Sequence, residues 1–290
     1  MRGVARAAGA ISVVNALPTG TGCAIGIERF ATATAEISEA AVLPVVTLNG
    51  APASPFIEAV AKRALECYAP DEPLSVNLVV RSELPVSRGL KSSSAVSTAI
   101  IGAIARAVDR PTDPREVARL SARAARESGV SATGAYDDAL AGLRPGFLVT
   151  DNRRDELVRA DPVDADWVAL LYVPSDPHRP SSEWKEAFHA VASEAEAIAE
   201  HARRGDYLAA MEANSDLVER VVGYHYRHLR ETLRSAGALA TGVSGMGPTL
   251  AAIVPRDRVD AAIAALPDDR AERFSVAFLR HEPLAEDRPE

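Results

Sequence analysis

The chain has 290 residues, a length that accommodates one large domain or two smaller ones. Charged residues make up 25% of it and hydrophobic residues 47%, a balance typical of globular proteins that fold in water. The formal net charge of -8 argues against a general binder of nucleic acid or anionic membrane, and no apolar run reaches the ~18 residues that span a bilayer, so we expect a cytoplasmic protein.

The first half is predicted to contain several strands around a few helices. β-branched or alternating segments predict strands at 10–17, 31–37, 42–48, 74–81 and 147–150. Proline or serine signals predict helices that begin near residues 55, 92 and 114. Of these, the helix from Ser92 to Ala105 is apolar nearly all round, which indicates a central, buried helix.

The second half is predicted to be richer in helices. A strand at 167–173 is followed by two or three helices within 184–236, a strand at 249–254, a helix at 259–266 and a strand at 273–279. The highly charged stretch 151–155 predicts a boundary between a domain at 1–155 and a domain at 156–290. Strands and helices do not alternate regularly, so the fold class is predicted to be α+β.

The segment between the strand at 74–81 and the buried helix has the character of a phosphate-binding loop. It reads Pro85, Val86, Ser87, Arg88, Gly89, Leu90, Lys91, Ser92, Ser93, Ser94, Ala95. Glycine lets the backbone approach a ligand closely, and a helix N-terminus offers free N–H groups and partial positive charge to an anion. The alternative interpretation is an ordinary helix capped by serine.

Phosphoryl transfer needs a phosphate site, a magnesium ion and a group that orients or deprotonates the acceptor hydroxyl. Ser92 to Ser94 and Lys91 supply the first of these, and Glu127 could help to hold Mg²⁺, which prefers oxygen ligands. Either Asp137 or Asp138, in a glycine-rich stretch, could act as the base. A solvated surface position is the alternative for any single carboxylate.

A second glycine pattern points to a different function. Gly20, Gly22 and Gly26 follow a strand, as in dinucleotide-binding turns, and Glu39 lies roughly where that motif places its ribose-binding acid. That motif requires a helix directly after the glycines. The residues that follow alternate with period two, which favours a strand and argues against this interpretation.

Three separated segments together resemble the GHMP kinase superfamily, which phosphorylates small molecules such as homoserine, mevalonate and galactose. Residues 10–22 stand where the N-terminal strand motif lies, 85–95 resembles the PxxxGLGSSAA phosphate loop, and 244–249 (Ser-Gly-Met-Gly-Pro-Thr) is similar to the C-terminal glycine-rich motif. The resemblance implies a two-domain fold, with an N-terminal part like ribosomal protein S5 domain 2 and a ferredoxin-like C-terminal part.

Two departures from the general pattern resemble the archaeal-type shikimate kinases. Lys91 replaces a glycine of the loop, and the acidic segment 133–139 reads Thr-Gly-Ala-Tyr-Asp-Asp-Ala. The resemblance implies transfer of the γ-phosphoryl of ATP to the 3-hydroxyl of shikimate, with Mg²⁺ as cofactor. The family lysine of the first motif is absent, with Ala10 near its place, so Lys91 could supply the missing charge.

The resemblance also implies roles for individual residues. Asp137 matches the catalytic aspartate, with Asp138 as the alternative because the alignment is loose by one residue, and Ser93 and Glu127 match the magnesium ligands. The candidates for the substrate side are Asn15, Thr19, Thr21, Tyr136, Asp138, Arg179, Gly245 and Gly247. An arginine is expected for the carboxylate of shikimate, and Arg88 and Arg179 are the candidates.

Two alternatives share the fold that the resemblance implies. One is a sister kinase that acts on homoserine or mevalonate, and the other is a regulatory protein that binds ligand without turnover. The expected partners are ATP and the small-molecule substrate, without nucleic acid or membrane, in a monomer or a homodimer.

Overall fold

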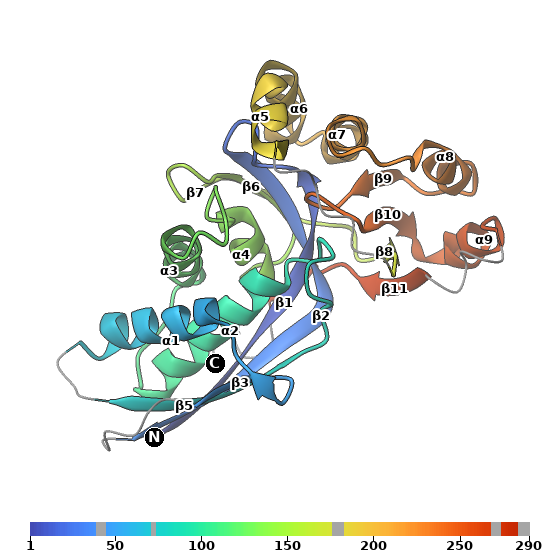
Figure 1. Cartoon of the computed structure of the whole chain (residues 1–290). Coiled ribbons are helices and arrows are strands. Elements are labelled where there is room, and N and C mark those ends of the chain that lie inside the picture. Colours follow the sequence, from blue (N-terminus) through green and yellow to red (C-terminus); the bar gives the residue numbers. More distant parts are fainter. Residues whose placement is uncertain (39–44, 71–73, 176–182, 268–273, 284–290) are drawn as a thin grey trace.

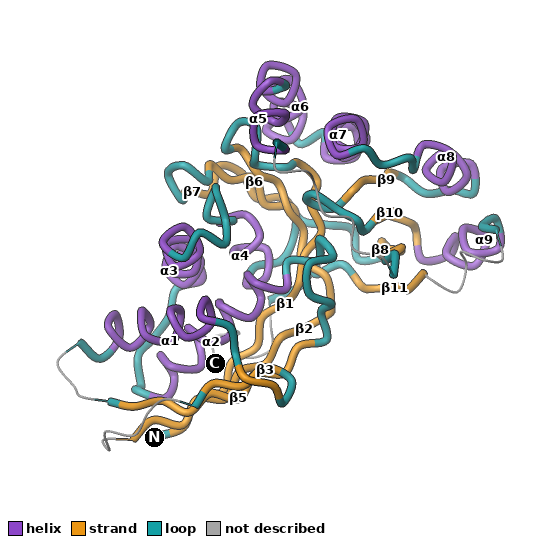
Figure 2. The backbone as a smooth tube through the Cα atoms, viewed as in Figure 1, coloured by secondary structure: helices purple, strands orange, loops and turns teal. Residues whose placement is uncertain are grey.

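The computed structural model describes residues 1–38, 45–70, 74–175, 183–267 and 274–283, and within them the chain forms two β-sheets with helices packed on each (Figures 1 and 2). The first sheet has seven strands, in the order β4-β3-β5-β2-β6-β7 with β1 paired to β2. Its strands are β1 (Arg2–Val14), β2 (Thr21–Ser38), β3 (Val46–Leu48), β4 (Ala51–Pro52), β5 (Ser75–Ser82), β6 (Phe147–Asp151) and β7 (Glu156–Asp161).

Four helices accompany the first sheet: α1 (Pro55–Tyr68), α2 (Ser92–Ala107), α3 (Pro114–Glu127) and α4 (Tyr136–Leu143). They lie together on one side of it, with α2 packed against β1 and β2 (Figure 1). From Ser94 to Ala107 the side chains of α2 are buried almost without exception. The prediction of a central, buried helix is therefore confirmed, because a helix with no polar face must be covered on all sides.

The second sheet is antiparallel and has the order β11-β8-β10-β9. It comprises β8 (Trp167–Tyr172), β9 (Ala240–Val243), β10 (Leu250–Pro255) and β11 (Phe274–Phe278). Its helices are α5 (Trp184–Ala190), α6 (Ala192–Arg204), α7 (Tyr207–Val222), α8 (Arg227–Ser235) and α9 (Val259–Ala264), the last preceded by a short 3-10 turn, η1 (Arg256–Arg258). Counted along the chain, the strand order is 4-1-3-2, which is the ferredoxin-like arrangement.

The two sheets meet along β1 and β2. Backbone N–H of Ser12 in β1 donates to Ser244 Oγ at 3.0 Å, and Ile27 of β2 forms an isolated bridge with Leu279 after β11. The boundary predicted between residues 155 and 156 falls at the turn between β6 and β7. These two strands pair with each other, so β7 belongs to the first sheet. A division of the chain into two domains at that point stays a prediction.

The α+β class predicted from the sequence is confirmed, whereas five elements escaped prediction, and residues 184–236 hold four helices where two or three were predicted. The five are β4, β7, β9, α4 and η1, all of them short, and α4 lies in the glycine-rich stretch that contains Asp137 and Asp138. The dinucleotide-binding interpretation of Gly20 to Gly26 is wrong, because these residues lead into the long strand β2 and no helix follows them. Glu39 lies outside the described residues.

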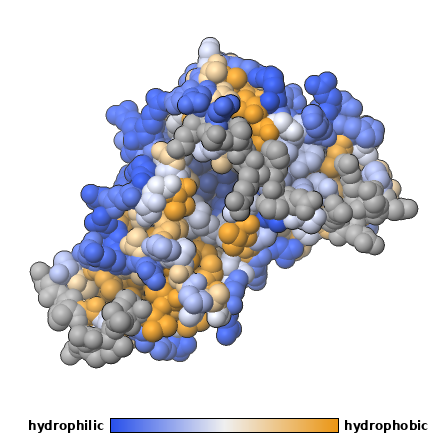
Figure 3. Space-filling view, viewed as in Figure 1, coloured by the Kyte–Doolittle hydropathy of each residue, from blue (hydrophilic) through white to orange (hydrophobic). Residues whose placement is uncertain are grey.

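The described surface is divided by polarity. On the face shown in Figure 3, hydrophobic residues gather over the part of the first sheet and its helices that lies at the lower left, and hydrophilic residues dominate the rim. Within the described part of the chain, no helix is both long enough and apolar enough to cross a membrane.

Candidate active site

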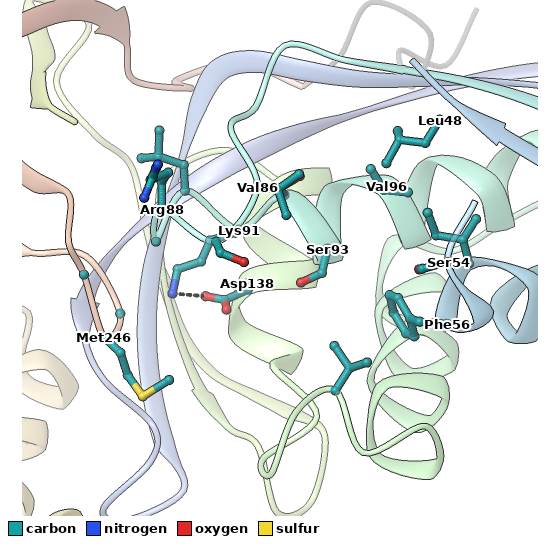
Figure 4. A pocket seen from close by; sticks show the side chains of 18 residues that line it. Leu48, Ser54, Phe56, Val86, Arg88, Lys91, Ser93, Val96, Asp138 and Met246 are labelled. Atoms are coloured by element: carbon teal, nitrogen blue, oxygen red, sulfur yellow. Dashed lines mark ion pairs between the residues drawn. The ribbon is translucent and has the colours of Figure 1, made fainter. Parts of the chain in front are cut away.

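A cavity of about 810 Å³ opens between the loop before α2, the start of α1 and the glycine-rich turn before β10. It is the place where segments from both sheets come together around the N-terminus of α2 (Figure 4). Its lining residues are Leu48, Ser54, Phe56, Ile57, Val86, Ser87, Arg88, Gly89, Leu90, Lys91, Ser92, Ser93, Val96, Val130, Asp138, Gly245, Met246 and Gly247.

The loop before α2 is anchored to the glycine-rich turn by its backbone. The hydroxyl of Ser244 donates to the carbonyl of Gly89 at 2.7 Å, and the N–H of Thr249 donates to the carbonyl of Arg88 at 3.3 Å. Gly89 has a φ of +84°, and a Cβ there would collide with the carbonyl oxygen of Ser244. The close approach of two segments more than 150 residues apart therefore depends on this glycine.

The N-terminus of α2 opens onto the cavity. Lys91 is the N-cap residue, in the left-handed region at φ 62°, and Ser92 and Ser93 form the first turn. The first N–H groups of a helix have no carbonyl partner within it, and the helix dipole places partial positive charge there. These groups, with the serine hydroxyls beside them, are suited to an anion such as phosphate.

Lys91 and Asp138 form an ion pair inside the cavity. Nζ of Lys91 lies 3.2 Å from Oδ1 of Asp138, and the two side chains are only 11% and 13% exposed (Figure 4). Burial raises the pKa of the Asp138 carboxyl from its ordinary 3.8 to about 7, with a further upward contribution from the charge of Asp137, while Lys91 acts in the opposite direction. A carboxylate with a pKa near neutrality is suited to accept a proton.

Asp137 occupies a different environment from its neighbour. Its Oδ1 accepts a hydrogen bond from Asn152 Nδ2 at 2.7 Å, its own N–H donates to Asn152 Oδ1 at 3.1 Å, and its side chain is packed against Gly22 of β2. It does not line the cavity. The geometry thus brings Asp138, the alternative that the sequence left open, to the cavity, and the match of Asp137 to the catalytic aspartate stays a prediction.

The helical phase of α4 determines which of the two aspartates lines the cavity. Successive residues of a helix point about 100° apart, and in the first turn of α4 the side chain of Asp138 is directed to the cavity while that of Asp137 is directed to Asn152. Ala135, the N-cap residue, has a φ of 53°, a left-handed conformation that the sequence did not reveal. The orientation of the helix therefore decides which acid reaches the cavity.

Two further candidates lie away from the cavity. Glu127, matched to a magnesium ligand, ends α3 on the surface, where Arg63 Nη2 approaches its carboxylate at 2.6 Å and Arg123 Nε at 3.2 Å. Those arginines lower the pKa of Glu127, and the residue borders a separate cavity of about 210 Å³. Tyr136 is fully buried among the alanines of α3, and burial raises the pKa of its hydroxyl.

The remaining substrate-side candidates divide into three groups. Gly245 and Gly247 line the cavity, and the buried Asn15 donates from Nδ2 to the carbonyl of Gly245 at 3.2 Å without lining it. Thr19 and Thr21 do not line it: Thr19 Oγ1 accepts from the N–H of Thr21, and Thr21 Oγ1 accepts from Arg203. Arg179 lies outside the described residues.

The structure brings eight of the eleven predicted loop residues to the cavity, from Val86 to Ser93. Pro85, Ser94 and Ala95 do not line it. Pro85 precedes the turn, and Ser94 and Ala95 are buried in the protein interior. Sequence reasoning missed the apolar wall, formed by Leu48, Phe56, Ile57, Val96, Val130 and Met246. In a sequence, apolar residues of this kind are taken for core residues. Among them, only Met246 lies within a recognised motif, between Gly245 and Gly247.

The donor set of the cavity fits magnesium in part. Ser92 and Ser93 present hydroxyls and Asp138 is the carboxylate among the described lining residues, whereas Glu127 lies elsewhere. Mg²⁺ commonly takes one or two protein oxygens and completes its shell with phosphate and water. Ser93, which the resemblance matches to a magnesium ligand, lines the cavity, and its role as a ligand stays a prediction. No group of three or more His, Cys, Asp or Glu side chains within the described ranges could form a metal centre by itself.

Sequence comparisons identify the family. Residues 56–146 match the GHMP kinases N terminal domain and residues 195–271 match the GHMP kinases C terminal domain. The chain is 34% identical to a shikimate kinase of Methanosarcina acetivorans, over 89% of this chain and 86% of the relative. It is also 34% identical to a shikimate kinase of Pyrococcus furiosus, over 87% of this chain and 92% of the relative.

Comparison with solved structures gives the same fold. A mevalonate kinase of L. major in complex with R-mevalonate superposes with a TM-score of 0.73 at 16% identity and covers 97% of each chain. A homoserine kinase of Cytophaga hutchinsonii superposes with a TM-score of 0.69 at 14% identity, over 97% of this chain and 95% of the other. The chain belongs to the GHMP kinase family, within the group that includes the archaeal shikimate kinases.

Proposed function

We propose that this protein is a shikimate kinase, which transfers the γ-phosphoryl of ATP to the 3-hydroxyl of shikimate with Mg²⁺ as cofactor. The observation that carries the proposal is the Lys91–Asp138 pair beside the start of α2, because it combines a proton acceptor with a phosphate site. The identity to shikimate kinases over nearly the whole chain supports shikimate as the acceptor.

The cavity has a polar part and an apolar part, which suit the two ends of ATP. Lys91, Ser92 and Ser93, at the start of α2, provide backbone N–H groups, hydroxyls and the charge of Lys91 for the phosphates. Leu48, Phe56 and Val96 provide an apolar wall for the flat base (Figure 4). Ser93 would help to hold Mg²⁺, which would neutralise part of the phosphate charge.

In the reaction, Asp138 accepts the proton of the 3-hydroxyl while that oxygen forms a bond to the γ-phosphorus. The bond between the γ-phosphorus and the bridging oxygen breaks, and ADP leaves with the electron pair. Lys91 holds the carboxylate in place and stabilises its charged form. Most of the remaining catalysis is positioning and charge stabilisation by the loop and the helix N-terminus.

The pKa of Asp138 predicts how the rate depends on pH. The carboxylate accepts a proton only when it is ionised, and its pKa is raised to about 7. We therefore expect kcat/KM to rise as the pH increases through about 7 and to level off above it. Measurement of kcat/KM for shikimate from pH 5 to 9 tests this, and a constant value below pH 6 would contradict it.

Gly245 is expected to matter because it leaves room for Lys91. At its φ of +63°, an added Cβ would lie 2.8 Å from Lys91 Nζ, so Gly245→Ala should displace the ammonium from Asp138. We expect kcat/KM to fall by about tenfold. Because Lys91 lowers the pKa of Asp138, we also expect the acidic limb of the profile, the range in which kcat/KM rises with pH, to move to higher pH. Gly50→Ala is the matched control, because Gly50 has a φ of +82° and nothing within 4 Å of the added Cβ.

The proposal is tested by a panel of acceptors. Purified protein with ATP, Mg²⁺ and shikimate should release ADP far faster than without acceptor, and homoserine and mevalonate should give little more than that background. Good turnover of either of those two without turnover of shikimate would assign a sister activity. Binding of ATP without turnover of any acceptor would instead assign a regulatory role.

A further inference from the structure

Arg88 has an unsatisfied charged group at the wall of the cavity. Its side chain lines the cavity, and its Nη1 is buried without a hydrogen-bond partner in the described part of the chain. Its Nη2 donates to the carbonyl of Ser175, after β8, at 2.6 Å. A buried charged donor without a partner is unfavourable, so an arginine held in this way is suited to an anion that enters with a ligand.

The backbone of Arg88 is held in place independently of its side chain. Its carbonyl accepts hydrogen bonds from both the N–H and the hydroxyl of Thr249, and the next carbonyl, that of Gly89, accepts from Ser244. The contact with Ser175 then restrains the guanidinium itself. The group is therefore preorganised, and little side-chain entropy remains to be lost when it binds an anion.

The other charged residues of the described lining already have partners. These are Lys91 and Asp138, which pair with each other. In Figure 4 this pair lies between Arg88 on one side and Ser93 with Phe56 on the other. An anion at Arg88 would thus lie across the ion pair from the start of α2, where the phosphates of ATP are proposed to bind. The acceptor must reach Asp138, and Arg88 stands on the side that ATP leaves open.

We propose that Arg88 binds the carboxylate of the acceptor, so that the enzyme selects hydroxy acids over neutral alcohols. This inference rests on the proposed function for the location of ATP. A guanidinium pairs with a carboxylate through two parallel hydrogen bonds, which orients the acceptor as well as attracting it. One oxygen of the carboxylate would accept a hydrogen bond from Nη1, and the acceptor hydroxyl would face Asp138.

The test combines a substitution with a change of substrate. Arg88→Met should lower kcat/KM for shikimate roughly 10- to 100-fold, as expected for loss of a charge-assisted hydrogen bond, and leave the KM for ATP within about twofold. Wild-type enzyme should prefer shikimate to its methyl ester, and Arg88→Met should lose that preference. Arg81→Met, on the exposed side of β5 and outside the cavity lining, should match the wild type in both respects.

A second variant separates charge from structure. Arg88→Gln keeps an N–H donor for Ser175 but removes the charge, so it should fold like the wild type and still lose the preference for the acid. A raised KM for ATP with an unchanged preference between acid and ester would overturn the proposal and place Arg88 at the nucleotide. Full kcat/KM for shikimate in Arg88→Gln would also overturn the proposal.

Failure of this inference can be told apart from failure of the proposed function. If the enzyme phosphorylates homoserine or mevalonate and not shikimate, shikimate is the wrong acceptor, yet Arg88→Met must still weaken the use of that acid. If shikimate is phosphorylated equally well by wild type and Arg88→Met, the function stands and the role of Arg88 is overturned. Efficient turnover of a neutral sugar such as galactose would also overturn it.

Discussion

Asp138→Asn is expected to lower kcat for shikimate phosphorylation roughly 10²- to 10⁴-fold, the usual contribution of a general base. The change keeps the size of the side chain and removes its ability to accept a proton. Because Asp138 lines the cavity and pairs with Lys91, the loss should appear mainly in kcat, with KM for ATP little changed. Steady-state kinetics with ATP and shikimate, with thermal unfolding as a check of folding, measure it.

Asp137→Asn is the matched control for that prediction. An asparagine still offers an oxygen to Asn152 Nδ2, so the local hydrogen bond can persist. Removing the charge of Asp137 removes one of the two causes that raise the pKa of Asp138, so the acidic limb of kcat/KM should move to lower pH. Should Asp137→Asn lose as much activity as expected for Asp138→Asn while the latter stays active, the two roles would be exchanged.

Lys91→Met should lower kcat/KM roughly 10²- to 10³-fold, which is the effect of deleting one well-placed donor in an active site. Lys91 both faces the phosphate site and holds Asp138 at 3.2 Å. Without its charge the pKa of Asp138 rises further, so the acidic limb should move above pH 7. Kinetics across pH 5 to 9 would show both the lower plateau and the displaced limb.

Lys62→Met is the control for this substitution. Lys62 lies on α1, its side chain is 80% exposed, and its contact with Glu66 spans 3.9 Å, so its removal should change little. Equal effects of Lys91→Met and Lys62→Met would favour the alternative interpretation, in which the segment at Ser92 is an ordinary helix cap. Opposite displacements of the acidic limb in Lys91→Met and Asp137→Asn would identify Asp138 as the titrating group.

The parts of the site that could be predicted are those encoded by adjacent residues. Gly89, Lys91 and Ser93 lie in one segment before a helix that is apolar nearly all round, and the structure brings all three to the cavity at the start of that helix. Their use as an anion site stays a prediction. The 244–249 turn could be predicted from its glycines. Its contact with Gly89 could not, because hydrogen bonds across more than 150 residues depend on how the two sheets pack.

The parts that could not be predicted depend on orientation and distant packing. The sequence places Asp137 and Asp138 together, and only the phase of α4 separates the acid in the cavity from the acid bound to Asn152. Glu127 lies at the end of α3 in a direction set by its contact with Arg63 on α1. The apolar wall of Leu48 and Phe56 comes from segments that sequence patterns mark only as strand and helix.

The most direct measurement is identification of the product by ³¹P and ¹H NMR after incubation of wild-type protein with ATP, Mg²⁺ and shikimate. We expect stoichiometric ADP and a single phosphomonoester whose phosphorus couples to the proton on carbon 3, with no product from Asp138→Asn over the same period. Phosphorylation at another hydroxyl, or ADP release without a phosphorylated acceptor, would contradict the assignment.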